Sequence, residues 1–299
     1  MKKIITISLA LSALLTATQC FSQSEPIRSP GAIIDQAPTT HWRALDPDKT
    51  LYIELEQGRV IVELNPQLAP NHVKQFQTLA NENFYDGLNF YRYVESFVAQ
   101  AGDREEKRKI KQAKASVKSE RIHYANKPLK ATYLPKNDGY ADKTGFINGF
   151  AIGSNAQQTQ YWQTHCPGAF AMARSNDPHS GSTEFYIVIG QSPRYLDKNL
   201  TVFGQVRSGI EYIHQLKRDP VTSAEKGVFD NQIKTLRLAS SVPVEQQTSL
   251  EVMDTDSASF KELIQSRMNR PNEFFIERPD YVDVCSVVVP VRTKALTKT

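Results

Sequence analysis

The chain has 299 residues, and 40% of them are hydrophobic, which is enough apolar material for a packed core and argues against intrinsic disorder. Its formal charge of +4 comes from 36 basic and 32 acidic residues, a balance that predicts neither nucleic acid nor an anionic membrane as a partner. The sequence contains no Walker-type loop, metalloprotease motif or Gly-x-Ser-x-Gly elbow, so nucleotide hydrolysis, metalloproteolysis and serine esterase chemistry lack support. We expect no metal and no cofactor.

Residues 1–22 have the pattern of a secretory signal peptide. Two lysines precede an apolar stretch at residues 4–15, which is too short to span a bilayer, and cleavage after Ser22 would satisfy the preference for small residues. A lipoprotein signal acylated at Cys20 is an alternative, although a glutamine precedes this cysteine where a small residue is preferred; an uncleaved anchor is another. We expect a periplasmic or secreted protein without a membrane span.

Residues 23–45 are rich in serine, proline and glutamine with little apolar periodicity, so we expect a linker that does not pack. Apolar residues then alternate with acidic ones from Leu51 to Glu56, and a second strand-like run extends from Arg59 to Leu64 after a glycine turn. This pattern predicts a β-hairpin near the start of a domain that spans residues 46–242.

A helix is predicted from Pro70, because Val73, Phe76 and Leu79 fall at helical spacing and proline is tolerated in the first turn. The remaining runs of this domain predict strands at residues 89–94, 97–100, 168–174, 184–189, 201–207 and 233–239, and a short helix at 210–217. Many short strands with only two helices predict a mainly β fold, a closed or nearly closed antiparallel β-barrel.

Two segments do not fit a compact barrel. Residues 104–165 form a long polar insertion, which begins with a basic run at residues 104–121 that we interpret first as a solvated helix and second as a contact for acidic partners. Residues 243–299 form a C-terminal α/β extension that we expect to pack on the barrel. There, Ser259 and Glu262 predict a capping box at the start of a helix, and residues 282–291 predict a strand.

Three segments resemble the signature of the cyclophilin family. They are Asn89–Asp103, Gly168–Arg174, and Glu184–Ile187 with Tyr195–Asp197 and Val202–Val206, and they occur in the order that the family has. The resemblance covers residues 48–103 and 166–240. It implies an antiparallel β-barrel capped by two helices that isomerises Xaa-Pro bonds.

The resemblance also implies roles for individual residues. It assigns the active-site arginine to Arg92, the proline-pocket phenylalanine to Phe97 and the neighbouring glutamine to Gln100. The other implied pocket and rim residues are Val98, Glu184, Tyr186, Tyr195, Leu196 and Leu200, and the strand that binds the substrate backbone is Ala173, Arg174 and Ser175.

An arginine suits this reaction. Rotation about a peptide bond faces a barrier of about 18–20 kcal/mol, and the twisted prolyl nitrogen regains a localised lone pair. A fixed cation aimed at that nitrogen stabilises the transition state more than the ground state, and a guanidinium keeps its charge at working pH. No nucleophile or metal is needed.

Several positions depart from the common family pattern: Glu184, Tyr186, Tyr195 and Leu200 stand where a glutamine, a phenylalanine, a tryptophan and a histidine are usual. We expect that Glu184 could draw Arg92 into an ion pair and compete with substrate. These departures should weaken the binding of drug-type macrocycles more than turnover.

Cys166 and Cys285 remain once the signal is removed, and an oxidising compartment would let them form a disulfide; two separately buried thiols are the alternative. The neighbouring pair His165 and Cys166 has no further ligands at the usual metal-binding spacing.

Two hypotheses of different class follow. The first is a monomeric peptidyl-prolyl cis-trans isomerase that acts on proline-containing segments of exported proteins. The second is a non-catalytic chaperone or scaffold that binds proline segments through a cyclophilin-like barrel. A barrel that holds a small apolar ligand has only the architecture in its favour.

Overall fold

The computed structural model describes residues 27–218 and 231–294 of the chain. The predicted signal peptide at residues 1–22 lies outside the described residues, as does Cys20. Within the described ranges, no helix combines the length and the apolar character that a membrane crossing requires.

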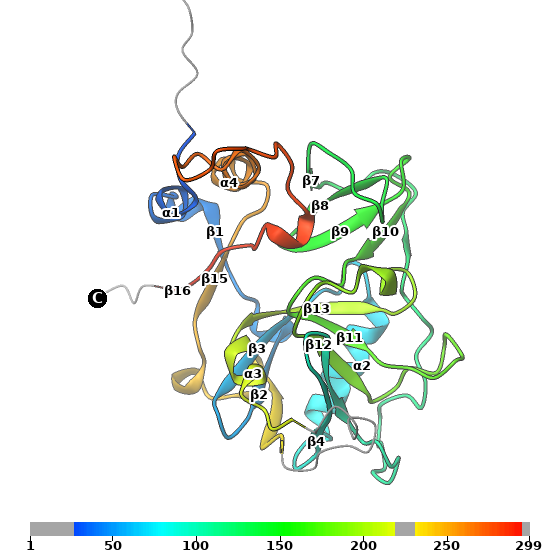
Figure 1. Ribbon diagram of the computed structural model, residues 1–299. Helices are drawn as coiled ribbons and strands as arrows, with labels where there is room; N and C mark the ends of the chain where they lie inside the picture. The colour runs from blue at the N-terminus through cyan, green and yellow to red at the C-terminus, as the bar shows by residue number, and fades with distance from the viewer. Residues whose placement is uncertain (1–26, 219–230, 295–299) are drawn as a thin grey trace, which may run out of the picture.

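An eight-stranded antiparallel sheet forms the larger part of the molecule (Figure 1). Its order is β14-β2-β3-β13-β11-β12-β5-β4, and a bridge between Asn89 and Gln232 brings the two ends together. The strands are β2 (Thr50–Glu54), β3 (Arg59–Leu64), β4 (Asn89–Val94), β5 (Val98–Gly102), β11 (Ala169–Met172), β12 (Phe185–Val188), β13 (Val202–Ser208) and β14 (Thr235–Leu238). The predicted mainly β, antiparallel barrel is confirmed.

Two helices contribute to the core of this barrel: α2 (Pro70–Asn81) and α3 (Ile210–His214). Phe76 of α2 is fully buried, and its ring lies 4.7–5.7 Å from the rings of four other aromatic residues. These four are Tyr85, Phe170, Phe185 and Phe203. Such aromatic packing buries much apolar area and fixes α2 on the sheet.

A second lobe lies above the barrel in Figure 1 and is built from three distant parts of the chain. One sheet has the order β6-β10-β9-β8-β7 and the other the order β1-β15-β16. Their strands are β1 (Trp42–Ala44), β6 (His123–Tyr124), β7 (Thr132–Tyr133), β8 (Lys143–Ile147), β9 (Phe150–Ser154), β10 (Gln160–Gln163), β15 (Leu250–Met253) and β16 (Val291–Thr293), and its helices are α1 (Pro30–Asp35) and α4 (Ala258–Asn269). We use "second lobe" for residues 30–44, 122–165 and 250–293.

The expected linker at residues 23–45 is therefore wrong from residue 30 onward. Ile33 of α1 is fully buried and Trp42 is 8% exposed, and both belong to the apolar core of the second lobe. β1 pairs with β15, so this segment is the edge of a sheet. Only a few apolar residues are needed to fix a segment when each fills a core position, and a test for periodicity does not detect them.

Two predictions in the C-terminal extension are also wrong. Helix α4 begins two residues earlier than expected, with Ser257 as the N-cap that accepts from the Phe260 N–H. Glu262 binds Arg28 instead of closing a capping box. The predicted strand at residues 282–291 is a short 3-10 turn (Val284–Ser286) and an irregular run, and β16 starts only at Val291. Pro290 lacks the N–H that strand pairing needs.

The basic run at residues 104–121 is irregular, so the expected solvated helix is wrong. The backbone of this run forms hydrogen bonds with side chains of α2 and of the turn that follows α2, where a helix would use its own carbonyls. Glu82 accepts from the N–H groups of residues 111–113, and Gln75 binds both the N–H and the carbonyl of Lys114. Glu120 accepts from the N–H groups of Asn71 and His72 at the start of α2. The segment therefore runs back along α2.

Two buried junctions join the second lobe to the barrel. In the first, Glu63 of β3 binds Arg207 of β13 and Arg43 of β1, and both arginines bind carbonyls of the β8–β9 turn. In the second, Cys166 and Cys285 form a disulfide across a sequence separation of 119 residues.

The contacts of Glu120 generate a testable prediction. Helix α2 has Ala69 at its N-cap, which offers no side-chain acceptor, and Glu120 supplies that acceptor from the insertion. Glu120→Ala should lower the free energy of unfolding by about 2 kcal/mol at pH 7, as measured by denaturant unfolding. Glu105→Ala changes an exposed carboxylate of the same segment and should leave the unfolding midpoint unchanged.

The effect of Glu120 should depend on pH with a defined sign. Burial raises the pKa of this carboxyl, but hydrogen bonds from His72 and the adjacent N–H groups outweigh it, so the pKa is lowered below its ordinary value of 4.5. The contribution to stability is therefore present above pH 4.5 and is lost as the pH falls through the lower native value. A destabilisation by Glu120→Ala that is equally large at pH 2 and pH 7 would contradict this account.

The disulfide should contribute strongly to stability, because it closes a long loop in the unfolded chain. Cys285→Ser should lower the free energy of unfolding by about 3–5 kcal/mol in the chain-entropy description. A thiol titration of the unfolded protein should find no reactive thiol from this pair without reductant and two with it. Two free thiols in the unreduced protein would disprove the pairing.

Candidate active site

The register of the barrel strands places three of the candidate residues in one row. Arg92 on β4 lies opposite Gln100 on β5, and Gln100 lies opposite Tyr186 on β12, which in turn lies opposite Ala171 on β11. Directly opposed residues of antiparallel strands project to the same face. The preceding residue on each of the strands β5, β12 and β11 faces the barrel core; these residues are Ala99, Phe185 and Phe170. Because side chains alternate along a strand, the row lies on the outer face.

An apolar cluster surrounds the row on this outer face. Its buried members are Val98, Ala169, Ala171, Tyr186, Val188 and Val202, and Phe97, Ala173 and Leu200 pack against it while partly exposed. Phe97, Val98, Tyr186 and Leu200, which the family resemblance assigned to the pocket or its rim, are thus brought together with Ala173. Ala169 and Ala171 are fully buried, so the accessible part of the cluster is formed by the partly exposed side chains of Phe97, Ala173 and Leu200.

A chain of polar contacts links Arg92 to Glu184. The Arg92 Nη1 lies 3.5 Å from Oε1 of Gln100, a long hydrogen bond. The Gln100 amide donates to the Tyr91 hydroxyl at 2.5 Å, and that hydroxyl donates to Glu184 Oε2 at 2.5 Å. The expected ion pair between Glu184 and Arg92 is replaced by this indirect link, in which Tyr91 is the direct partner of Glu184.

Glu184 lies in an unusual environment for a carboxylate. Burial raises its pKa to about 7, the hydrogen-bond donors Tyr91 and Gln100 act against this shift, and the charges of Asp103 and Glu106 add to it. Its Oε1 is buried without a hydrogen-bond partner. Gly102, at a φ of 143°, leaves the space that this carboxylate occupies, because a Cβ there would lie 2.2 Å from Oε1.

The remaining predicted residues lie at the border of this face or away from it. The Arg174 guanidinium binds the Asn199 carbonyl, and Ser175 is exposed and bonded to Ser180. Tyr195, 61% exposed, and Leu196 belong to a 3-10 turn and do not pack against the apolar cluster. The predicted pocket residues therefore lie together around Tyr186, and Tyr195 and Leu196 lie apart from them.

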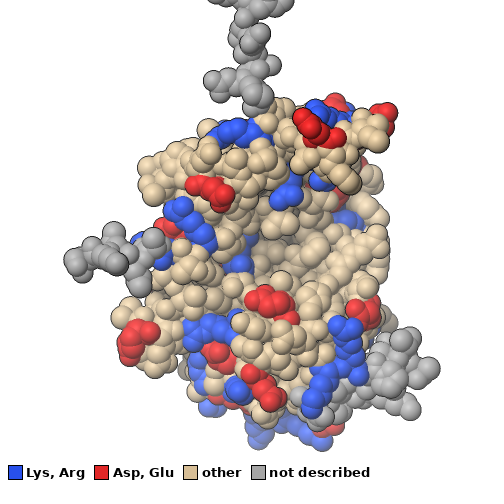
Figure 2. Space-filling model, turned by 60° about the vertical axis from the view of Figure 1, so that its left-hand side comes forward, with Lys and Arg blue, Asp and Glu red and all other residues tan. Residues whose placement is uncertain are grey.

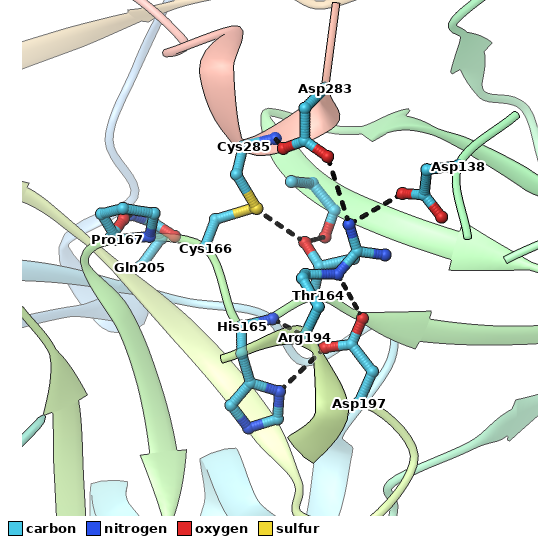
Figure 3. Close-up of a disulfide and its surroundings, with 11 residues drawn as sticks. Asp138, Thr164, His165, Cys166, Pro167, Arg194, Asp197, Gln205, Asp283 and Cys285 are labelled. Atoms are coloured by element: carbon cyan, nitrogen blue, oxygen red, sulfur yellow. Dashed lines mark hydrogen bonds and ion pairs between the residues drawn. A yellow bond between two sulfur atoms is a disulfide. The ribbon is translucent and has the colours of Figure 1, made fainter. Parts of the chain in front are cut away.

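Sequence reasoning missed the residues that hold Tyr186 from behind. Its hydroxyl lies 2.9 Å from Nε2 of His165. Nδ1 of that histidine lies 2.9 Å from Oδ1 of Asp197, as Figure 3 shows. Asp197 belongs to a segment that resembles the family signature, and the sequence suggests His165 only as a metal ligand. The sequence therefore gives no sign that either residue supports Tyr186. Tyr91 was missed as well, because a β-bulge between Asn89 and Arg92 shifts the alternation of β4.

The chemistry available on the outer face is electrostatic. Arg92 and Gln100 lie in a row beside an apolar cluster whose partly exposed members are Phe97, Ala173 and Leu200. Such an arrangement can bind a compact apolar ring and place a guanidinium near it. The described ranges contain no group of three or more His, Cys, Asp or Glu residues that could hold a metal ion.

A separate hollow lies between the barrel and the second lobe, and its walls in Figure 2 carry few charged side chains. It has a volume of about 530 Å³ and is lined on one side by valines of residues 284–291 and on the other by residues 205–211. None of the predicted site residues lines it, except the disulfide cysteines.

Comparisons with known proteins agree with this picture. A family model described as "Cyclophilin type peptidyl-prolyl cis-trans isomerase/CLD" matches residues 50–238. A probable peptidyl-prolyl cis-trans isomerase of Brucella suis is 29% identical over 194 residues, which cover 65% of this chain and 83% of the relative. Peptidyl-prolyl cis-trans isomerase B of Bacillus subtilis is 32% identical over 174 residues, which cover 58% and 94%.

Among solved structures, the crystal structure of cyclophilin AquaCyp293 from Hirschia baltica superposes with a TM-score of 0.68 at 26% identity. It covers 85% of this chain and 94% of that chain, so the likeness extends beyond the barrel into the second lobe. Because the family model matches more than half of the chain and spans the whole barrel, the chain belongs to the cyclophilin-type peptidyl-prolyl cis-trans isomerases.

Proposed function

We propose that the outer face around Arg92 is where this isomerase binds and turns over its Xaa-Pro substrates. The observation that supports this most is the row of Arg92, Gln100 and Tyr186 beside the apolar cluster. In this proposal the cluster holds the proline ring, with Phe97 and Val98 on one side of Tyr186. The guanidinium of Arg92 then donates to the prolyl nitrogen as the amide twists.

The rate gain expected of an isomerase is within reach of such a contact. A rate gain of about 10⁵ requires about 7 kcal/mol of differential stabilisation. A charge-assisted hydrogen bond in a partly dehydrated site, together with positioning of the ring, can supply energies of this order. Gln100 has one amide oxygen near Arg92 and its nitrogen on Tyr91, so it would keep the guanidinium in place over the apolar surface.

We further propose that the substrates are exported proteins. The signal-like pattern of residues 1–22 supports export, and the Cys166–Cys285 disulfide suits an oxidising compartment. The class of substrate would then be proline-containing segments of secreted or periplasmic chains while they fold, when the isomerisation of Xaa-Pro bonds is slow.

The alternative, a non-catalytic module that binds proline segments, draws support from the apolar hollow between the lobes. A binding module has no need of a guanidinium in line with an amide and an apolar cluster, whereas an isomerase does. We therefore prefer the enzymatic proposal for the outer face.

Replacement of Arg92 tests the proposal. Arg92→Ala should reduce kcat/KM on a short Xaa-Pro peptide by at least about 100-fold, because it removes the donor that stabilises the twisted amide. Exchange spectroscopy between the cis and trans peptide signals measures this directly. Arg59→Ala, which changes a partly buried arginine paired with Glu54 elsewhere on the barrel, should retain wild-type turnover. Equal turnover of Arg92→Ala and wild type would disprove the role of Arg92.

Glu184 should make both activity and stability depend on pH. As the carboxyl ionises near pH 7, its charge should weaken the field of Arg92 at the prolyl nitrogen, so kcat/KM should fall about 3-fold between pH 6 and pH 8. Glu184→Gln should flatten this profile. An exposed control, Glu245→Gln, should keep the wild-type profile. A wild-type profile that Glu184→Gln leaves unaltered would show that Glu184 does not act on the site.

The stability effect has the opposite sign from that of Glu120. Because the pKa of Glu184 is raised in the native state, the folded protein keeps a proton that the unfolded chain releases, and stability falls as the pH rises from about 4.5 to about 7. Glu184→Gln should remove this loss and raise the free energy of unfolding by up to about 3 kcal/mol at pH 8, with little change at pH 4. Denaturant unfolding at the two pH values measures the difference.

A further inference from the structure

The tyrosine at position 186 differs from a phenylalanine by one buried hydroxyl. Tyr186 is 4% exposed, and its ring forms part of the outer apolar cluster. The hydroxyl points away from that cluster toward the His165 ring, at 2.9 Å from Nε2, and the two rings are nearly parallel with centroids 6.1 Å apart. A buried hydroxyl of this kind needs its partner, because an unpaired one costs about 1–3 kcal/mol.

His165 is held on its other side by Asp197. The histidine is fully buried, and its Nδ1 and its backbone N–H both lie 2.9 Å from Oδ1 of Asp197. An ionised carboxylate only accepts, so Nδ1 carries the proton that faces Asp197; in the tautomer protonated at Nδ1 alone, Nε2 accepts from the Tyr186 hydroxyl. Burial and the charge of Asp197 raise the pKa of Tyr186 well above its ordinary value, so the hydroxyl keeps the proton that it donates.

Asp197 is in turn tied to the second lobe. Its Oδ2 lies 2.5 Å from Nε of Arg194, a guanidinium that is only 4% exposed. Nη1 of Arg194 lies 2.8 Å from Asp138 in the insertion and 3.7 Å from Asp283 in the C-terminal extension. Figure 3 shows these two aspartates converging on Arg194 beside Cys285.

We propose that His165, at the end of the second lobe, is a positioning residue for the prolyl pocket, and that Asp138 and Asp283 of the same lobe help to fix it through Arg194 and Asp197. This inference relies on the proposed function of the outer face. His165 does not touch that face; it acts through Tyr186, whose ring is one wall of the proposed pocket. The second lobe therefore contributes to the affinity of the proposed pocket for a proline ring.

The effect should fall on binding of the substrate more than on the chemical step. Tyr186→Phe leaves Nε2 of His165 as a buried acceptor without a partner and frees the ring to shift. The reacting amide would lie over Arg92 and Gln100, which this change does not touch. We therefore expect KM to rise about 5-fold, with kcat within 2-fold of wild type.

A double-mutant cycle tests the link between the two side chains. His165→Asn keeps a group near Asp197 but cannot reach Tyr186, and it should raise KM about as much as Tyr186→Phe. The double variant should be no worse than either single one within 2-fold. His165→Gln retains a polar atom near the position of Nε2 and should restore KM to within 2-fold of wild type. Tyr52→Phe removes another buried tyrosine hydroxyl, bonded to Thr248, and should leave KM and kcat unchanged.

A variant in the second lobe tests the longer part of the chain. Asp138→Asn weakens one contact of Arg194 without entering the barrel, and it should raise KM about 3-fold in the wild-type background but not in the Tyr186→Phe background. Thermal melts of all variants show which ones keep the wild-type fold.

The outcomes separate this inference from the proposed function. Wild-type turnover that Arg92→Ala abolishes supports the proposed site, and a wild-type KM for Tyr186→Phe would then still overturn the inference. So would KM effects of His165→Asn and Tyr186→Phe that multiply in the double variant, or equal losses in the Gln and Asn variants of His165. Dissociation constants of a short Ala-Pro peptide, measured in parallel by NMR titration, should follow the same pattern and decide the inference even if turnover is absent.

Discussion

In an antiparallel sheet, opposed residues project to the same face, and this constraint arranges both the core and the site of this protein. The pairing of β4, β5, β12 and β11 places Phe170 and Phe185 inside the barrel. The same pairing places Arg92, Gln100 and Tyr186 outside in a row. A slip of one residue in β5 would exchange the two sets, so the aromatic core around Phe76 also fixes the geometry of the outer face. Packing energy thus specifies the position of the catalytic candidate.

The second lobe depends on a different constraint, the need of buried charges for partners. Arg194 is almost completely buried, and removal of a guanidinium from water is costly unless carboxylates compensate it. Three aspartates compensate its charge: Asp197 from the barrel loop, Asp138 from the insertion and Asp283 from the C-terminal extension. Glu63 with Arg43 and Arg207 does the same at the other junction. These contacts define how three distant segments meet, and one of them continues to the wall of the proposed pocket.

Local patterns in the sequence sufficed for the barrel and for much of the outer face. Alternation predicted β2 and β3, and helical spacing predicted α2, because each element has one face on a single apolar core. The same reasoning failed where partners are distant in sequence: residues 30–44, the start of α4 and the basic run along α2. There, Ile33, Ser257 and Glu82 act through contacts that no local period reveals. His165 was missed for the same reason, because its partners Tyr186 and Asp197 are 21 and 32 residues away.

The central claim is that the proline ring binds on the outer face between Arg92 and Tyr186. The most direct measurement is a titration of the full-length protein with a short Ala-Pro peptide, followed residue by residue in amide NMR spectra. The account predicts that the largest shifts occur in β4, β5, β11 and β12 around Gln100, with smaller shifts at His165 and Asp197 behind the pocket wall. Shifts confined to the hollow between the lobes, at residues 205–211 and 284–291, would contradict it.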